Sequence, residues 1–146
     1  MAGKFKLQPV LNYRQSLEDQ AQQALAASLQ LRGELENRLL KEQEQLGQND
    51  AELKQRQKKG MTIAEIDLFE AQIGHHRRVI SQLREGLGQL EEKILAQREV
   101  LFEAARNREI MEKLKARKVA EQRRELDRRE RAMLDEISLR GKGEEV

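Results

Sequence analysis

The apolar residues between Thr62 and Arg140 follow one narrow line along a helix. This span of roughly eighty residues contains no proline, and the steps between its apolar positions alternate between three and four residues. Such heptad spacing is typical of a coiled-coil seam rather than of the wider apolar face of a globular helix. We therefore predict one helix over about 62–140. Its seam positions are Ile66, Phe69, Ile73, Ile80, Leu83, Leu87, Leu90, Ile94 and Leu101, with His76 as the polar exception.

A second, shorter line of apolar residues precedes this one and predicts a helix over about 9–58. Pro9 is suited to its first turn, because the missing N–H of proline would have no intrahelical partner there. The four-residue step from Leu35 to Leu39 breaks the alternation and predicts a stutter that locally unwinds the supercoil. The seam positions of this helix are Val10, Leu17, Ala21, Ala24, Leu31, Leu35, Leu39, Leu46 and Leu53.

The residues between the two helices combine a helix stop with a helix start. Lys58 and Lys59 precede Gly60, and glycine readily adopts the left-handed conformation that ends many helices. Thr62 and Glu65 then have the spacing of a capping box. We therefore predict a turn at about 59–61. The alternative is one continuous helix with a kink at Gly60.

If the chain folds back at this turn, apolar positions of the two helices face each other. Leu46 then faces Ile73, and beyond the stutter Ala24 faces Ile94 and Leu17 faces Leu101. The predicted fold class is therefore all-α, a two-helix antiparallel coiled-coil hairpin with a longer second helix. We expect a single coiled-coil domain over residues 1–146, with a flexible tail at 141–146.

The second helix is longer than the first, so the chain itself offers no partner for it beyond about Lys115. An apolar stripe nevertheless continues there after a four-residue slip, through Val119, Leu126, Met133 and Ile137. An isolated helix gains little from an exposed apolar stripe, because most helical stability comes from packing. We therefore expect another molecule to cover it, either a second copy or a different protein.

Composition narrows the class of protein. Charged residues make up 37% of the chain, and 28 basic residues nearly balance 26 acidic ones, which fits a long helical protein better than a globular core. The absence of cysteine excludes disulfides and thiolate metal sites. There is no apolar stretch of membrane-spanning length and no signal-peptide pattern at the N-terminus, so we expect a soluble, cytoplasmic protein.

The sequence shows no constellation that would support catalysis or bind a cofactor, a metal ion or a small molecule. There is no phosphate-binding loop, and the carboxylates alternate with lysine and arginine as on a solvated helix face. His75 and His76 are adjacent, so they point in different directions on a helix and cannot share a metal ion as a pair four residues apart would. His76 lies on the seam, where a core or interface histidine is favoured. We expect no enzymatic activity and no cofactor.

A basic cluster covers the helix from Arg106 to Arg131. Eleven basic residues lie there among six acidic ones, which leaves an excess of five positive charges. The intervening carboxylates would repel a phosphate backbone. We therefore favour a protein partner with acidic loops over a merely solvated face or a nucleic acid.

The order of these parts resembles the flagellar FliJ family over nearly the whole chain. The resemblance is carried by the lead Phe5-Lys6-Leu7-Gln8-Pro9-Val10-Leu11, the turn Gly60-Met61-Thr62, the following Ile66, Phe69 and Ile73, and the basic final helix closing with Leu134-Asp135-Glu136-Ile137. It implies an antiparallel two-helix coiled coil of the flagellar type III export apparatus. It also implies a central stalk of the hexameric flagellar export ATPase, similar to the γ subunit of rotary ATPases. Further implied partners are the membrane export-gate protein and export chaperones, at a site peripheral to the cell membrane at the flagellar base.

The resemblance also implies where these partners bind. The gate contact lies near the turn and is carried over to Phe69 and His76, although Arg38, Glu42, Gln45 and Asn49 stand on the first helix where apolar residues are expected. The free basic end would enter the ATPase ring. The alternatives are a homodimeric coiled-coil scaffold or tethering protein and a helical nucleic-acid-binding arm. The expected ATPase contacts are Arg123, Arg124, Leu126, Arg128, Arg129, Met133 and Ile137.

Overall fold

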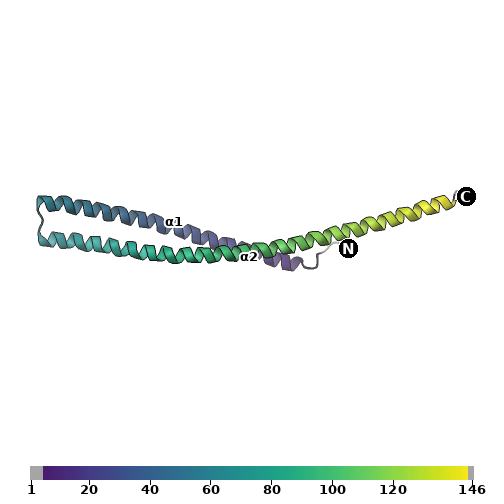
Figure 1. The fold of residues 1–146 in the computed structure, drawn as a ribbon, viewed down its shortest axis with the longest axis horizontal. Helices are drawn as coiled ribbons and strands as arrows, with labels where there is room; N and C mark the ends of the chain where they lie inside the picture. Colours follow the sequence, from purple (N-terminus) through teal and green to yellow (C-terminus); the bar gives the residue numbers. More distant parts are fainter. Residues whose placement is uncertain (1–4, 145–146) are drawn as a thin grey trace. The chain divides into compact units, whose positions relative to one another are not determined.

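The computed structural model describes residues 5–144, and over this range the chain forms two helices and no strand. Helix α1 comprises Gln8–Lys59 and has 52 residues, and α2 comprises Ile63–Glu144 and has 82 residues. Figure 1 shows both helices. The predicted all-α hairpin with a longer second helix is confirmed.

The ends of the helices differ slightly from those predicted. Helix α1 extends one residue further at each end than the predicted 9–58. Helix α2 continues to Glu144, so the tail predicted from residue 141 is helical over its first four residues, while residues 145 and 146 lie outside the described part. The glycine at 141 does not end the helix because it keeps ordinary helical backbone angles.

The turn reverses the chain at the predicted place. Gly60 has a φ of 94°, the one positive φ among the described residues, and its N–H donates to the carbonyl of Gln57 at 3.4 Å. Thr62 Oγ1 accepts a hydrogen bond from the N–H of Glu65 at 3.2 Å, which is one half of the predicted capping box. The left-handed conformation of Gly60 redirects the backbone, so the alternative of a kinked continuous helix is wrong.

The chain divides into two compact units. Unit 2 comprises Ala21–Val100 and contains the turn, and unit 1 comprises Met1–Gln20 together with Leu101–Val146. The expectation of a single coiled-coil domain stays a prediction.

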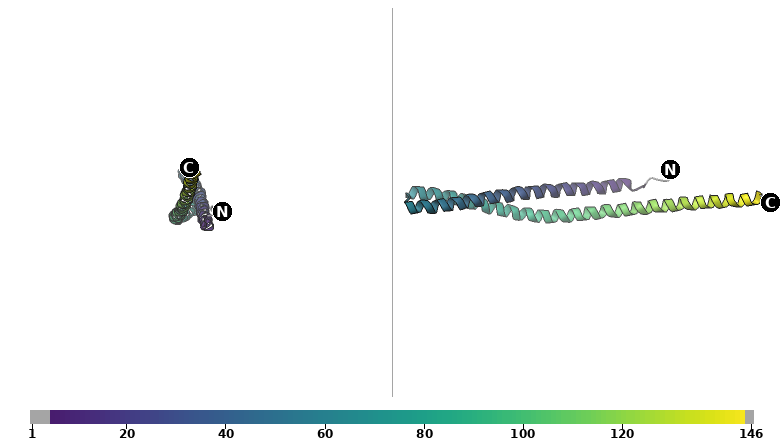
Figure 2. Two further views of the ribbon diagram at one scale, coloured as in Figure 1. Left: turned by 90° about the vertical axis from the view of Figure 1, so that its right-hand side faces the viewer. Right: turned by 90° about the horizontal axis from the view of Figure 1, so that it is seen from above.

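In unit 2, residues of α1 and α2 lie side by side in antiparallel directions on either side of the turn (Figures 1 and 2). Taken together, the buried and half-buried seam positions of α2 repeat at three and four residues, as predicted. The remaining predicted positions of α2 in this unit, including Ile66 and Leu87, are half-buried. The buried ones are Ile73, Ile80, Leu83, Leu90 and Ile94.

The seam of α1 in unit 2 differs from the prediction. Leu31 is 45% exposed and Ala24 is exposed, whereas Leu25 is half-buried and Ser28 is only 5% exposed. The stutter at Leu35 is therefore absent, and the prediction that Ala24 faces Ile94 is wrong. Several polar residues occupy true seam positions, so tracing apolar residues alone shifted the line by one residue. The seam runs in unbroken heptads through Ala21, Leu25, Ser28, Arg32, Leu35, Leu39, Glu42, Leu46, Asn49 and Leu53.

In unit 1, the first turns of α1 pack against α2 through Leu11, which is 3% exposed. The predicted seam residue Val10 is largely exposed beside it, and Leu17 and Leu101 are both half-buried. From Arg117 to Gly141, every described side chain of α2 is exposed except that of Gln122. This long exposed portion of α2 extends beyond the part of the helix that α1 covers.

Candidate functional site

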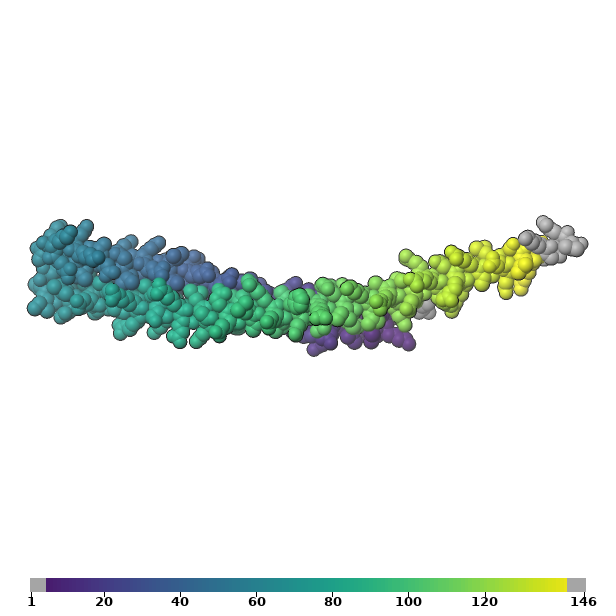
Figure 3. Space-filling model, viewed as in Figure 1, coloured from purple at the N-terminus to yellow at the C-terminus, as the bar shows by residue number. Residues whose placement is uncertain are grey.

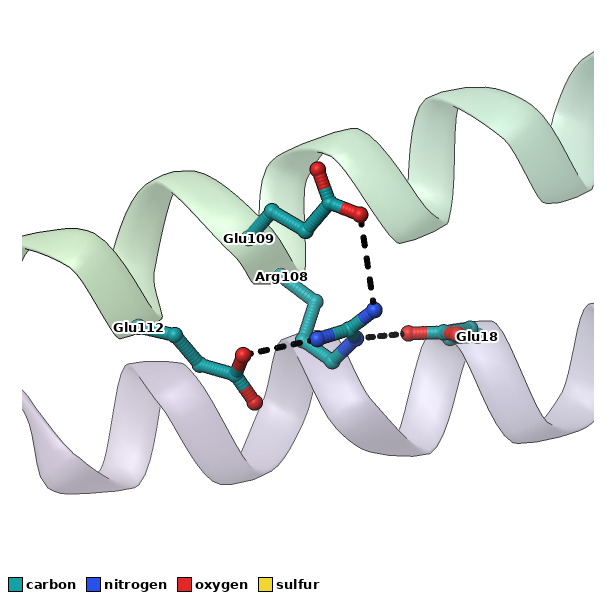
Figure 4. Close-up of polar contacts among 4 residues, drawn as sticks. All are labelled: Glu18, Arg108, Glu109 and Glu112. Carbon is teal, nitrogen blue, oxygen red and sulfur yellow. Dashed lines mark hydrogen bonds and ion pairs between the residues drawn. The ribbon is translucent and has the colours of Figure 1, made fainter.

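An ionic cluster joins the start of α1 to α2 in unit 1. The Nε of Arg108 donates to the carboxylate of Glu18 on α1, and its Nη1 donates to Glu112 Oε2 at 2.8 Å (Figure 4). Glu109 lies 3.8 Å from Nη2. The hydrogen bond to Glu18 and the nearby carboxylates raise the pKa of Arg108. The charge of Arg108 is therefore paired with carboxylates of the same chain. From the sequence, we expected it to belong to the basic cluster that binds a partner.

A groove of about 720 Å³ opens next to this cluster, where α1 begins. One wall is formed by the first two turns of α1, and α2 forms the other. Small, apolar and amide side chains line it together with five charged side chains, three of them basic and two acidic. The lining residues are Gln8, Leu11, Gln15, Glu112, Lys115, Ala116, Val119, Ala120, Arg123, Arg124 and Asp127.

The exposed end of α2 continues from this groove and carries the predicted apolar stripe. Val119, Leu126 and Met133 are 47%, 49% and 63% exposed. They are seven residues apart, so they lie on one side of the helix, two turns from one another. Ile137 continues the stripe and is also exposed. In Figures 1 and 3 this portion of α2 is the green-to-yellow end of the molecule.

The arginines of this end differ in how they are paired. Arg128 and Arg129 both contact the carboxylate of Glu125, at 2.9 Å and 3.6 Å. Within the described part of the chain, Arg123 and Arg124 have no ion pair within 4 Å, and both line the groove. All seven predicted ATPase contacts are therefore exposed on one stretch of α2. That they contact an ATPase stays a prediction.

The two predicted gate residues in unit 2 both contact α1. Phe69 is half-buried, and the guanidinium carbon of Arg56 lies 5.3 Å from its ring centroid. His76 Nδ1 lies 2.7 Å from Glu42 Oε2, and the His76 side chain is only 17% exposed. The sequence identified His76 as a seam residue but missed Glu42 as its partner. Heptad steps from Leu39 and Leu46 would have placed Glu42 on the seam.

Other apolar side chains near the turn are far more accessible than these two. Ile63 is 79% exposed and Leu68 is 62% exposed. Both lie off the seam, so the heptad pattern does not mark them. The signal in the sequence that could have found them is that they are apolar residues placed outside the heptad line.

The described residues contain no cluster of histidine and carboxylate side chains suited to a metal ion. No helix among them has both the length and the apolar character needed to span a bilayer.

Comparison with known proteins gives one match. The model of the family described as Flagellar FliJ protein matches residues 3–143, which is nearly the whole chain. No curated protein matches the chain, and no solved structure does.

Proposed function

Because this chain belongs to the flagellar FliJ family, we propose that it is the stalk that couples the hexameric export ATPase to the export gate. Family membership confirms the resemblance found in the sequence and makes the chain a non-enzymatic component of the flagellar protein export apparatus. The specific contacts with the ATPase and the gate are our proposal.

The exposed end of α2 is the observation that supports ATPase binding. It combines an exposed apolar stripe with Arg123 and Arg124, which have no ion pair among the described residues. The inner surface of an ATPase ring can offer both apolar side chains and carboxylates. Arginine binds a carboxylate through two parallel hydrogen bonds, which fixes orientation as well as supplying charge.

Charge reversal tests this contact. Replacing Arg123, Arg124, Arg128 and Arg129 with Glu should abolish stimulation of the purified export ATPase, and the wild-type stimulation should weaken as salt rises. Helicity by circular dichroism should stay unchanged, because all four side chains are exposed in unit 1. A matched control reverses four exposed basic residues in unit 2, which are Arg77, Arg78, Arg84 and Lys93.

The control variant should stimulate the ATPase as the wild type does. If the variant at the end of α2 also stimulates normally, the arginine contacts are wrong, and the docking surface should be sought near Gly60. Loss of stimulation in both variants would mean that overall charge, rather than this end of α2, governs the effect.

We place the export-gate contact near the turn, at Phe69 and His76. The family resemblance motivates this assignment, and the half-exposed ring of Phe69 is compatible with it. His76 contributes only if its contact with Glu42 opens, because its Nδ1 is already engaged. Export chaperones are further proposed partners, and the proposed location is the cytoplasmic side of the cell membrane at the flagellar base.

A further inference from the structure

The exposed stripe of α2 begins in the groove beside the start of α1. Leu11, Ala116 and Ala120 line it, and Val119 belongs both to the groove and to the stripe. We propose that an acidic amphipathic helix of the partner docks in this groove and continues along the stripe, so that it takes over from α1 as the second helix of a coiled coil. This inference rests on the proposed function only in taking the export ATPase as the protein that supplies the helix.

The spacing of the stripe indicates that the docked segment is a helix. Val119, Leu126 and Met133 recur every seven residues, so they supply one of the two seam positions in each heptad of a coiled coil. A loop that touched α2 at one point would not require this period. The alanines at 116 and 120 leave room for a second backbone to approach closely beside the start of α1.

The charges next to the stripe indicate that the helix is acidic. Between Lys115 and Arg131 there are eight basic and four acidic residues, an excess of four positive charges, and Asp135 and Glu136 reduce this excess to two over the stripe as far as Ile137. The carboxylate of Glu112 at the groove is already bonded to Arg108, whereas Arg123 and Arg124 are unpaired within the described residues. A second copy of this chain would bring the same positive excess into contact with itself. The charge pattern therefore favours an acidic partner over a homodimer.

A synthetic peptide tests the chemistry directly. The probe is a labelled helix of about three heptads with leucine at both seam positions and glutamate at the flanking positions. Fluorescence anisotropy with the full chain should show binding that weakens as salt rises. A peptide with lysine in place of every glutamate should bind about tenfold more weakly or not at all.

Two pairs of variants locate the binding site. Ala120→Trp should fill the groove and weaken peptide binding about tenfold, while Ala96→Trp, also at an exposed alanine of α2, should have no effect. Replacing both Arg123 and Arg124 with Glu should weaken peptide binding to a similar degree. Replacing both Arg77 and Arg78, an adjacent exposed pair in unit 2, with Glu should leave peptide binding unchanged.

The inference is overturned by equal binding of the lysine peptide, by unchanged binding with Ala120→Trp, or by preferential binding of a duplex DNA oligonucleotide over the acidic peptide. Dimerisation of the chain through the stripe, seen by sedimentation and abolished by Leu126→Arg, would also overturn it.

The test separates this inference from the proposed function. If the acidic peptide does not bind but the chain still stimulates the ATPase, the helix is wrong and the stalk role stands. If the peptide binds as described but the ATPase is not stimulated, the groove accepts an acidic helix from another protein, and the proposed ATPase contact is wrong.

Discussion

Single side chains at the seam of unit 2 determine which groups near the turn are accessible. His76 Nδ1 and Glu42 Oε2 lie 2.7 Å apart between layers of leucine and isoleucine and form a hydrogen bond across the seam. Removing one partner from such a half-buried pair leaves a polar group unsatisfied, at a cost of about 1–3 kcal/mol. A polar pair within an apolar seam also disfavours a shifted register, because shifted helices would separate the two groups. The same contact limits the access of a partner to His76.

Phe69 provides a test at this scale. Because its ring is only half-buried, Phe69→Ala should reduce the free energy of unfolding by less than the roughly 3–5 kcal/mol typical of a fully buried phenylalanine. If the ring contacts the export gate, binding to the cytoplasmic part of the gate protein should fall more than stability does. Urea unfolding and a binding titration measure the two effects.

Leu83→Ala is the control, because Leu83 is a buried seam residue without a proposed gate contact. It should lower stability more than Phe69→Ala and leave gate binding intact when measured on folded protein. Unchanged gate binding by Phe69→Ala, together with a large loss of stability, would remove Phe69 from the gate contact.

At the scale of the helices, the heptad line of α2 was predictable because almost every seam position is apolar. The line of α1 was predictable only in part. Leu35, Leu39, Leu46 and Leu53 were placed correctly, but Ser28 and Arg32 occupy seam positions that apolar residues alone do not reveal. Following the apolar residues alone led to the neighbouring line of α1, on which Leu31 is exposed. Counting heptad steps through polar as well as apolar positions would have given the correct seam of α1.

Cysteine pairs distinguish the two lines of α1 by experiment. The chain has no native cysteine. Cysteines at Leu25 and Ile94 should form a disulfide within one chain, because Leu25 lies on the seam and Ile94 is the most deeply buried residue. Cysteines at Ala24 and Ile94 should link much more slowly, because Ala24 is exposed.

Mobility on a non-reducing gel measures both reactions. Faster closure of the pair that includes position 24 would restore the originally predicted seam. Disulfides formed only between chains would contradict the hairpin itself.

At the scale of the whole molecule, the sequence predicted the all-α class, the turn, the inequality of the helices and the family. The exposed stripe was also predictable, because Val119, Leu126 and Met133 keep the heptad period past the start of the first helix. The groove was not predictable, because it depends on which turn of α2 lies beside the first turns of α1. The internal pairing of Arg108 was missed for the same reason, since Glu18 is distant in the sequence.

The central claim is that the free end of α2 contacts the export ATPase, and site-specific photo-crosslinking tests it most directly. A photoreactive phenylalanine analogue at Leu126, exposed at the end of α2, should cross-link to the ATPase in the assembled export complex. The same analogue at Leu68, exposed near the turn, should not. Mass spectrometry of the linked peptides identifies the contact. Cross-links from Leu68 to the ATPase with none from Leu126 would contradict the account.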